Sequence, residues 1–360
     1  MRASAGGGCG PHGSPSRTIS PKPDTMEHRT SDIDFVIFWV DGSDPAWLAQ
    51  RREWVPAPND ELEDASPIRS RDWRTLRHWF RAVERFAPWV RRVHFVTWGH
   101  MPAWLDTSHP KLHVVNHRDF IPAEYLPTFN SLTIGLNLHR IEGLAEQFVV
   151  FNDDMFLGRP CRPEHFFRGG LPRDMARLCV VQASSIGHIV YNDLELLNAA
   201  WSARTTLRRH AGKWFSPRYG ATNLLKTLSL AIWSFFPGIF DPHLPQPYLR
   251  RQWQRAWELW GDRLDATCRH RLRSLTDVSD YLVRYDMLCR GEFRPIGLGD
   301  GRLLTLEDAT LESTCRDIER QRWRLVCLND SERIADFEAA SRRLCAAFER
   351  ILPEKSSYER

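Results

Sequence analysis

The chain carries, at residues 148–157, the sequence Phe148-Val-Val-Phe-Asn-Asp-Asp-Met-Phe-Leu157, in which two aspartates interrupt an apolar, β-prone run. The run predicts a buried strand that ends at the acidic pair Asp153 and Asp154. A buried carboxylate is unfavourable unless a cation or a proton offsets its charge, and two adjacent carboxylates are more so. The pair therefore favours a divalent cation that holds a phosphate. The alternative is that both aspartates cap a following turn or helix.

Strand and helix patterns alternate before this point. Short apolar runs mark the strands, and the helical spacing of apolar residues marks the helices between them. The alternation predicts an α/β fold with parallel strands in its sheet. We expect strands at 34–40, 93–98 and 112–115, a helix at 72–87 that Asp72 caps, and a helix that begins at Asn130 or Ser131 and carries Ile134, Leu138 and Ile141 on one face.

Acidic turns follow two of the predicted strands. Asp41-Gly-Ser-Asp44 follows the predicted strand at 34–40, and Asn152-Asp-Asp154 follows the apolar run that begins at Phe148. Ligands of parallel sheets bind beyond the carboxyl ends of the strands. If the two strands are neighbours, both turns reach one cleft, which strengthens the interpretation as a metal and phosphate site.

The second half of the chain has more helical patterns than strand patterns. Residues 228–240 are apolar but too short to span a membrane, so we expect a core helix there, with contact with a membrane surface as the alternative. We also expect helices at 249–264 and 276–289, the latter capped by Thr276 or Asp277, a strand at 324–328, and an amphipathic last helix carrying Ile334, Phe337, Leu344, Phe348 and Ile351. The predicted organisation is a disordered segment at 1–30, an α/β nucleotide-sugar and metal-binding core at 31–170, a mostly helical acceptor and phosphate-site region at 171–320, and a strand and helix at 321–360 that pack back on the core.

Two short segments of the second half carry candidate catalytic side chains. His243 lies between Pro242 and Pro245-Gln-Pro247, and prolines restrict the backbone. A neutral imidazole there is able to take a proton from an attacking hydroxyl, and a histidine bonded to a backbone carbonyl is the alternative. Arg271 and Arg273 are two residues apart, so in an extended segment both point to one side and suit a pyrophosphate; a solvated basic face is the alternative.

A third acidic turn follows the late strand. Asn329 and Asp330 repeat the pattern of polar residues at a strand end, with a plain turn as the alternative. Cys327 lies within the same strand, and no neighbouring histidine pattern activates it, so we expect an inert thiol.

Composition narrows the class of protein. Only five of the 49 basic residues are lysine, and arginine suits phosphate, although a codon bias explains the excess equally well. Forty-five interspersed acidic residues and the absence of any nucleic-acid-binding motif argue against nucleic acid. The eight scattered cysteines indicate a reducing compartment rather than a disulfide framework. No signal peptide or transmembrane span is predicted, and the P-loop, dinucleotide-binding and G-x-S-x-G motifs are absent.

Four blocks of sequence together resemble the Stealth family of sugar-1-phosphate transferases, which includes bacterial capsular polysaccharide phosphotransferases and the lysosomal-enzyme GlcNAc-1-phosphotransferase. The blocks occur in order and cover most of residues 32–359. The similar segments are Ile33 to Pro45; Arg71-Asp72 to Arg91, with His94 to Thr97, Leu126 to Ser131, Leu138 to Ile141 and Phe151 to Asp154; Pro242 to Pro245, with His270 to Arg273 and Asp277; and Val326 to Asp330, with Phe348 and Pro353 to Ser357.

The resemblance implies a Rossmann-like, glycosyltransferase-A-like sheet flanked by helices, with a mostly helical C-terminal part. It implies transfer of a sugar-1-phosphate from a UDP-sugar to a hydroxyl of an acceptor glycan, which is either free or lipid-linked, with release of UMP. It further implies that Asp153, Asp154 and Asp330 bind Mg²⁺ or Mn²⁺ and that His243, Arg273 and Asp154 act at the transferring phosphate. The implied substrate-binding residues are Trp39, Asp41, Gly42, Asp44, Arg71, Asp72, Asn130, Ser131, Arg271 and Asn329.

One position departs from the family pattern. After Asn130 and Ser131, members of the family usually carry an Ile-Glu pair, whereas this chain has Ile134-Gly135. The missing carboxylate leaves three interpretations: water or another acid replaces it, the enzyme is weak or differently specific, or the protein is a sugar-nucleotide or glycan-binding scaffold. A metal-dependent glycosyltransferase that releases UDP is a further alternative. We expect a bacterial protein, either free in the cytoplasm or peripheral to the inner membrane, and either monomeric or homo-oligomeric.

Overall fold

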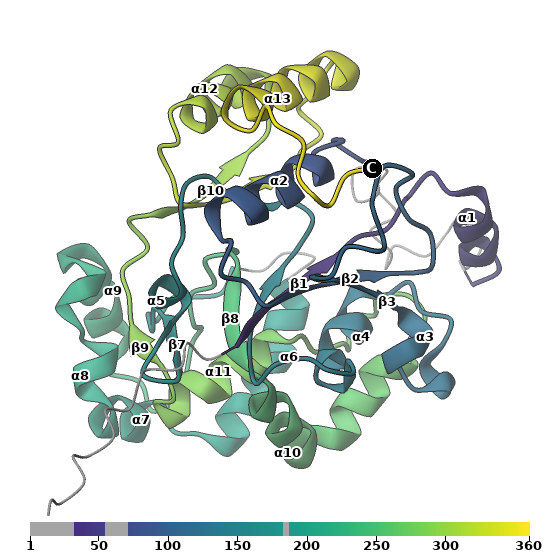
Figure 1. Cartoon of the computed structure of the whole chain (residues 1–360). Coiled ribbons are helices and arrows are strands. Elements are labelled where there is room, and N and C mark those ends of the chain that lie inside the picture. The colour runs from purple at the N-terminus through teal and green to yellow at the C-terminus, as the bar shows by residue number, and fades with distance from the viewer. Residues whose placement is uncertain (1–31, 55–70, 183–186) are drawn as a thin grey trace, which may run out of the picture. The chain divides into compact units, whose positions relative to one another are not determined.

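The computed structural model describes residues 32–54, 71–182 and 187–360, and these residues all belong to one compact unit (Figure 1). The segment expected to be disordered, residues 1–30, lies outside the described residues. A five-stranded sheet in the order β3-β2-β1-β4-β8 forms the centre. Strands β1 to β4 run parallel, and β8 is antiparallel to β4, which confirms the predicted α/β fold. The strands are β1 (Ile33–Phe38), β2 (Arg92–Thr97), β3 (Leu112–Asn116), β4 (Gln147–Phe151) and β8 (Gln246–Leu249).

Both faces of this sheet are covered, which explains why its strands read as continuous apolar runs. Phe35 and Ile37 of β1 belong to the core cluster that includes residues of α2 (Leu76–Phe86) and α13 (Phe337–Ile351). Val36, whose side chain points to the opposite face, belongs to the second core cluster. This cluster includes residues of α4 (Ser131–Leu136), α10 (Arg250–Arg269) and α11 (Tyr281–Arg290). Figure 1 shows α2 on one side of the sheet and α4 and α10 on the other.

The helices of the first half are shorter than the sequence pattern predicts. Helix α2 begins after Thr75, so the prediction that Asp72 caps it is wrong; Asp72 Oδ1 instead accepts a hydrogen bond from the Arg74 N–H. Asn130 caps α4 as predicted, but α4 ends at Leu136, where the Asn137 side chain donates to the Thr133 carbonyl. The helices are α1 (Pro45–Arg52), α2 (Leu76–Phe86), α3 (His117–Phe120), α4 (Ser131–Leu136) and α5 (Pro163–Phe166).

The second half is mostly helical, as expected, and adds a small sheet in the order β6-β7-β9. The predicted cap of the helix at 276–289 is wrong: α11 begins at Tyr281, and Asp277 instead accepts from the Asn130 side chain and the Ser274 N–H. The elements are β6 (Phe167–Arg168), β7 (Leu171–Asp174), β9 (Arg294–Pro295), α6 (Gly187–Ala200), α7 (Ala203–Arg209), α8 (Ala211–Trp214), α9 (Ala221–Leu230), α10 (Arg250–Arg269) and α11 (Tyr281–Arg290).

The apolar stretch 228–240 does not form the expected core helix. Helix α9 ends at Leu230, and Phe236 and Ile239 point into the core. Four apolar side chains of the stretch, one in the last turn of α9 and three after it, are 47–67 % exposed: Leu228, Ile232, Trp233 and Phe235. No helix in the described part of the chain is long and apolar enough to cross a membrane.

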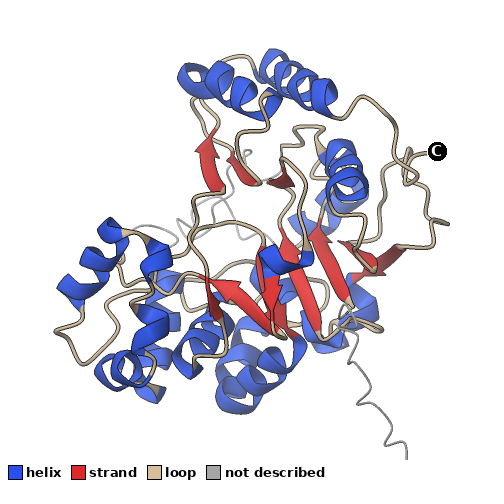
Figure 2. Ribbon diagram, turned by 60° about the vertical axis from the view of Figure 1, so that its left-hand side comes forward, coloured by secondary structure: helices blue, strands red, loops and turns tan. Residues whose placement is uncertain are grey.

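A third sheet, in the order β10-β11-β5, connects the acidic turn to the C-terminal elements (Figure 2). Strand β5 follows the turn directly and pairs antiparallel with β11, while β10 pairs parallel with β11. Residues 152–154 therefore bridge the central sheet and the third sheet. The elements are β5 (Met155–Leu157), β10 (Gly301–Thr305), β11 (Leu325–Asn329), α12 (Asp308–Glu319) and α13 (Phe337–Ile351), so the predicted late strand and last helix are confirmed, although Ile334 precedes the helix.

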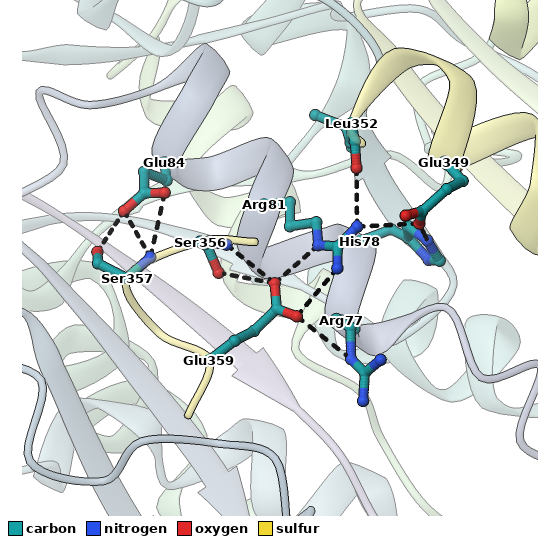
Figure 3. Close-up of polar contacts among 9 residues, drawn as sticks. All are labelled: Arg77, His78, Arg81, Glu84, Glu349, Leu352, Ser356, Ser357 and Glu359. Atoms are coloured by element: carbon teal, nitrogen blue, oxygen red, sulfur yellow. Dashed lines mark hydrogen bonds and ion pairs between the residues drawn. The ribbon is translucent and has the colours of Figure 1, made fainter. Parts of the chain in front are cut away.

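The C-terminal segment is fastened to α2 by four polar side chains that we call the C-terminal clamp: His78, Arg81, Glu349 and Glu359 (Figure 3). Arg81 Nε lies 2.7 Å from Glu359 Oε1, and Arg81 Nη1 lies 2.9 Å from Glu349 Oε2. His78 Nε2 lies 3.0 Å from the same Glu349 oxygen. Every charge of the clamp thus has an opposite charge beside it.

Candidate active site

A cavity of 520 Å³ opens where the central and third sheets meet. It lies beyond the carboxyl ends of β1 and β4, which is where parallel sheets bind ligands. The structure brings nine of the predicted site residues to its wall, from six separate parts of the chain: Trp39, Arg71, Asp72, Asp153, Asp154, His243, Arg273, Asn329 and Asp330.

The acidic turn after β1 stands apart from this wall. Asp41 Oδ1 accepts hydrogen bonds from the backbone N–H and the hydroxyl of Ser43, so it closes its own turn. Asp44 is the N-cap of α1, where its side chain accepts from the N–H groups of Ala46 and Trp47. Neither residue lines the cavity, and neither does Gly42. The two acids therefore stabilise the turn and the start of α1, and they do not reach the cavity.

Three other predicted substrate-binding residues also lie off the wall of this cavity. Asn130 is buried, caps α4 and donates to Asp277 at 2.8 Å. Ser131 accepts a hydrogen bond from Arg273 Nη2 at 2.6 Å. Arg271 stacks its guanidinium 5.4 Å from the Trp54 ring centroid. Arg271 and Arg273 therefore do not face one ligand together, contrary to the expectation from their spacing.

Asp154 carries an incompletely satisfied carboxylate. Its Oδ2 accepts from the Cys327 thiol at 3.2 Å and lies 3.6 Å from His243 Nε2. Its Oδ1 is buried and has no hydrogen-bond partner among the described residues. A buried carboxylate oxygen without a partner is unfavourable in a folded protein, so this oxygen fits a positively charged ligand.

Two acids on the same cavity wall, Asp153 and Asp72, have raised pKa values. Although solvent in the cavity reaches Asp153, burial by the surrounding protein and then the charge of Asp154 raise the pKa of Asp153 to about 7. Burial also raises the pKa of Asp72, and the charge of Asp41 adds to this. Carboxylates that repel one another in this way are typical of cation sites and of functional sites.

Asp330 differs from these acids because it already has a cation. Arg71 binds it in bidentate fashion, with Nε at 3.0 Å and Nη2 at 2.7 Å from its two oxygens. An arginine so fixed holds Asp330 at the cavity wall but occupies both oxygens. Asp153 and Asp154 are therefore better placed than Asp330 to hold a metal ion.

His243 occupies a strained backbone position at the centre of the site. Its φ of +47° lies in the left-handed region, which non-glycine residues rarely adopt, and the flanking prolines restrict any relaxation. Its Nδ1 lies 3.2 Å from the Tyr281 hydroxyl, and its Nε2 faces Asp154. Burial by itself would lower the pKa of His243, but the hydrogen bond and charge of Asp154, followed by Asp241 and Asp280, raise it.

The donor atoms at this point fit a divalent cation. One ligand atom each from Asp154, His243 and Cys327 lie within 4.8 Å of one another. Burial and then Asp154 raise the pKa of the Cys327 thiol, so this sulfur stays protonated and donates to Asp154. The carboxylates of Asp153 and Asp154 remain as oxygen ligands, and the unpartnered Asp154 Oδ1 is the atom that a cation would satisfy.

A second cavity of 340 Å³ adjoins the first. Asn152, His243 and Arg273 line both cavities and so mark the boundary between them. Gly135, Asp280 and Tyr281 line the second cavity but not the first. The sequence patterns assigned no role to Asp280 or Tyr281, and they treated Cys327 as inert, because no local motif links these residues to Asp154.

Comparisons with known proteins support an enzymatic site. Residues 31–57 match the model for conserved region 1 of the Stealth proteins, and residues 69–173 match the model for conserved region 2. The two regions contain β1 and the acidic turn after β4.

Curated relatives match over nearly their whole length. The chain is 37% identical over 337 residues to the capsular polysaccharide phosphotransferase WcwK of Streptococcus pneumoniae, covering 92% of this chain and 99% of the relative. It is 35% identical over 332 residues to the exopolysaccharide phosphotransferase cps2G of Lactiplantibacillus plantarum, covering 91% and 96%. It is 34% identical over 331 residues to the receptor polysaccharide phosphotransferase WefC of Streptococcus oralis, covering 91% and 99%.

Proposed function

The chain belongs to the Stealth family, and we propose that it transfers a sugar-1-phosphate from a UDP-sugar to a hydroxyl of an acceptor glycan, releasing UMP, in the synthesis of a capsular or other cell-surface polysaccharide. The observation that carries the proposal is the meeting of Asp153, Asp154, His243 and Arg273 on one cavity wall. Phosphoryl transfer needs these groups: acids for a metal, an arginine for phosphate charge, and a base for the nucleophile.

Asp153 and Asp154 are the proposed ligands of Mg²⁺ or Mn²⁺. Both ions prefer oxygen ligands, and the unpartnered Asp154 oxygen supports this choice. When bound, the ion would neutralise part of the negative charge of the diphosphate. Cys327 is proposed to position Asp154, because its thiol donates to the other oxygen of that carboxylate.

The proposed chemical step is an in-line displacement at the phosphorus that carries the sugar. The acceptor hydroxyl oxygen forms a new bond to this phosphorus, and the bond to the bridging oxygen of UMP breaks. UMP leaves with the electron pair of that bond, and His243 takes the proton of the acceptor hydroxyl. Arg273 neutralises the charge that gathers on the phosphoryl oxygens.

Donor binding is proposed for the residues that line the first cavity. Trp39, Arg71, Asp72 and Asn329 are within reach of a nucleotide diphosphate there. For Asp41, Gly42, Asp44, Asn130 and Arg271 we propose an indirect role, because their side chains or backbone shape the walls of the site from outside.

The identity of the released nucleotide tests the proposed function. The purified protein is incubated with UDP-glucose, UDP-galactose or UDP-N-acetylglucosamine, Mg²⁺ and a panel of sugar acceptors, and the nucleotides are separated by chromatography. UMP together with a phosphodiester-linked sugar is the expected product. Release of UDP would mean a glycosyltransferase that attacks the anomeric carbon, and binding without turnover of any donor would mean a scaffold.

A location at the inner membrane, where a lipid-linked acceptor would lie, is proposed from the exposed apolar side chains near α9. Residues 201–240 contain no acidic residue but contain Arg204, Arg208, Arg209, Lys213, Arg218 and Lys226. Arg204 Nη2 donates to the Ile232 carbonyl, which places a guanidinium beside the exposed Ile232, Trp233 and Phe235. Apolar side chains with surrounding cations suit an anionic lipid surface.

Vesicle flotation tests this location. The protein is expected to float with vesicles that contain phosphatidylglycerol and to stay in solution with pure phosphatidylcholine. The double variant Ile232→Ser, Trp233→Ser is expected to lose flotation, whereas Leu303→Ser, which removes an exposed leucine on β10, is expected to keep it. Equal flotation of all three proteins, or of none, would contradict the proposed location.

A further inference from the structure

The second cavity contains one carboxylate, that of Asp280, whose hydrogen bond comes from its own backbone N–H and not from another side chain of the described residues. Most polar side chains on its wall already have partners: Asp241 accepts from Arg284 and Tyr285, Ser279 donates to Asp193, Gln246 donates to Asp174, Ser131 accepts from Arg273, and His243 faces Tyr281 and Asp154. No hydrogen bond or ion pair joins the Asp280 carboxylate to another side chain within residues 32–54, 71–182 and 187–360.

Asp280 also lies in an unusual position on its helix. It precedes α11 directly, yet its side chain makes no capping hydrogen bond to that helix. Acids at helix N-termini ordinarily accept from the free backbone N–H groups there. The Asp280 carboxylate therefore does not cap α11, although it is placed at the N-cap position.

Gly135, on the facing helix α4, leaves space in front of this carboxylate. A Cβ atom at position 135 would lie 3.6 Å from Asp280 Cγ, so any larger side chain would enter the same space. The absence of a side chain at Gly135 thus keeps the cavity open. Glycine at this buried helical position destabilises the helix by about 1 kcal/mol relative to alanine. Burial raises the pKa of Asp280 to about 6, although a hydrogen bond from its own backbone N–H and then the nearby His243 imidazole oppose this shift.

The position of the second cavity relative to the first defines what it can hold. An in-line displacement requires the attacking oxygen and the leaving oxygen to lie on opposite sides of the phosphorus. Asn152, His243 and Arg273 line both cavities, so the reacting phosphorus is expected at the boundary. If UMP occupies the acidic first cavity, the nucleophile must approach from the second.

The lining of the second cavity suits a sugar ring. Carbohydrates present apolar ring faces and hydroxyl donors, and the wall combines Ile189, Val190 and the aromatic rings of Phe38, Tyr248 and Tyr281 with the acceptor oxygens of Asp280. We infer that the second cavity is the acceptor-sugar site and that Asp280 positions the sugar by accepting hydrogen bonds from its hydroxyl groups. The inference rests on the proposed function, because it assigns the nucleophile of that same reaction.

Steady-state kinetics with the donor and acceptor varied separately test the inference. The probes are octyl β-glucoside, octyl β-galactoside and octyl N-acetyl-β-glucosaminide, and the readout is UMP release from the UDP-sugar. Asp280→Asn keeps the shape but loses the charge, so the KM for the accepted octyl glycoside is expected to rise about 10-fold or more while the donor KM stays within about twofold. Gly135→Leu, which fills the cavity without changing Asp280, is expected to raise the same acceptor KM.

A matched control and three contrary outcomes complete the experiment. Asp262→Asn removes an exposed acid of α10 and is expected to change neither KM. An unchanged acceptor KM in Asp280→Asn, or a rise in the donor KM, would overturn the inference; the second outcome would assign the cavity to the donor sugar. UMP release that none of the three glycosides stimulates in the wild-type protein would also overturn it. A wild-type protein that releases no UMP would instead contradict the proposed function.

Discussion

The C-terminal clamp and the active site contain the same kinds of side chains in opposite electrostatic states. In the clamp, Glu359 is 2% exposed, and Arg81 donates to both of its oxygens. In the active site, Asp154 has one buried oxygen with no partner among the described residues, and Asp153 lies next to it. The carboxylates of the clamp are paired without a ligand, whereas one oxygen of Asp154 has no partner among the described residues and is open to a cation.

The pKa values of the two regions record this difference. Burial pushes the pKa of Glu359 upward, but hydrogen bonds from Arg81 and Ser356 outweigh it and hold the pKa below its ordinary value. Burial and Asp154 raise the pKa of Asp153 to about 7, with no arginine to reverse the shift. A buried acid paired with an arginine, such as Glu359, stabilises the fold, whereas an acid held beside a like charge at a cavity wall, such as Asp153, is typical of a binding site.

The largest expected effect is on activity, in Asp154→Asn. The amide keeps the acceptor oxygen for Cys327 but loses the charge that holds the cation, so we expect turnover to fall by about 10³-fold or more. The melting temperature is expected to stay close to that of the wild type, because the ion pair that is lost, between Asp154 and His243, is long at 3.6 Å and partly exposed to solvent. Turnover is measured as UMP release, and full activity in this variant would refute the metal assignment.

The largest expected effect on stability is in Arg81→Met. This change leaves the Glu359 carboxylate buried, and the half-exposed Arg77, at 3.4 Å, is then its one cation among the described residues. Leaving a buried charge unpaired costs about 3–5 kcal/mol, so the free energy of unfolding is expected to fall by roughly that amount. Urea unfolding measures it, and Mn²⁺ binding by the folded variant serves as the control. A stability equal to that of the wild type would show that the clamp does not fasten the C-terminal segment.

A smaller and pH-dependent effect is expected in Glu359→Gln. The folded-state pKa of Glu359 lies below its ordinary value of 4.5, so its charge contributes stability above pH 4.5 and loses that contribution as the pH falls through the folded-state pKa. At pH 7 the variant is expected to be less stable by about 1–3 kcal/mol. The difference from the wild type is expected to shrink in unfolding curves recorded below pH 4.5. A difference that is constant with pH would contradict the pairing.

The smallest effect is expected at an exposed ion pair that is as short as those of the clamp. Arg251 Nη1 lies 2.6 Å from Glu146 Oε1, with both side chains nearly half exposed. Glu146→Gln is expected to change the free energy of unfolding by less than about 1 kcal/mol, because water already screens the pair. A loss as large as that in Arg81→Met would show that pairing alone, rather than burial, sets the energetic difference between regions.

The sequence was sufficient to predict the four parallel strands of the central sheet, but not the edge strand β8, which contains Pro247. Parallel strands that are covered on both faces must be apolar throughout, so β1 and β4 could be recognised directly from their composition. The lengths of the helices could not be predicted as well, because single side chains end them: Asn137 bonds back to Thr133 at the end of α4. The stretch 228–240 shows a further limit, since apolar composition does not reveal whether protein covers a segment.

Residues of the candidate site could be predicted where acidic side chains directly follow a strand. Asp153 and Asp154 satisfy this rule and line the cavity, but Asp44 satisfies it equally and caps α1 instead. Local sequence does not distinguish a ligand from a cap, because both need a short acid after a strand. The pairing of Arg71 with Asp330, 259 residues apart, and the unpaired state of Asp280 follow only from the tertiary structure.

Mn²⁺ binding measured by electron paramagnetic resonance tests most directly whether the unbalanced acids form a cation site. Free Mn²⁺ is titrated against the wild-type protein, Asp154→Asn and Glu359→Gln. We predict one bound ion in the wild type and in Glu359→Gln, and loss of this binding in Asp154→Asn. Equal Mn²⁺ binding by Asp154→Asn and the wild type, or no binding by any of the three proteins, would contradict the account.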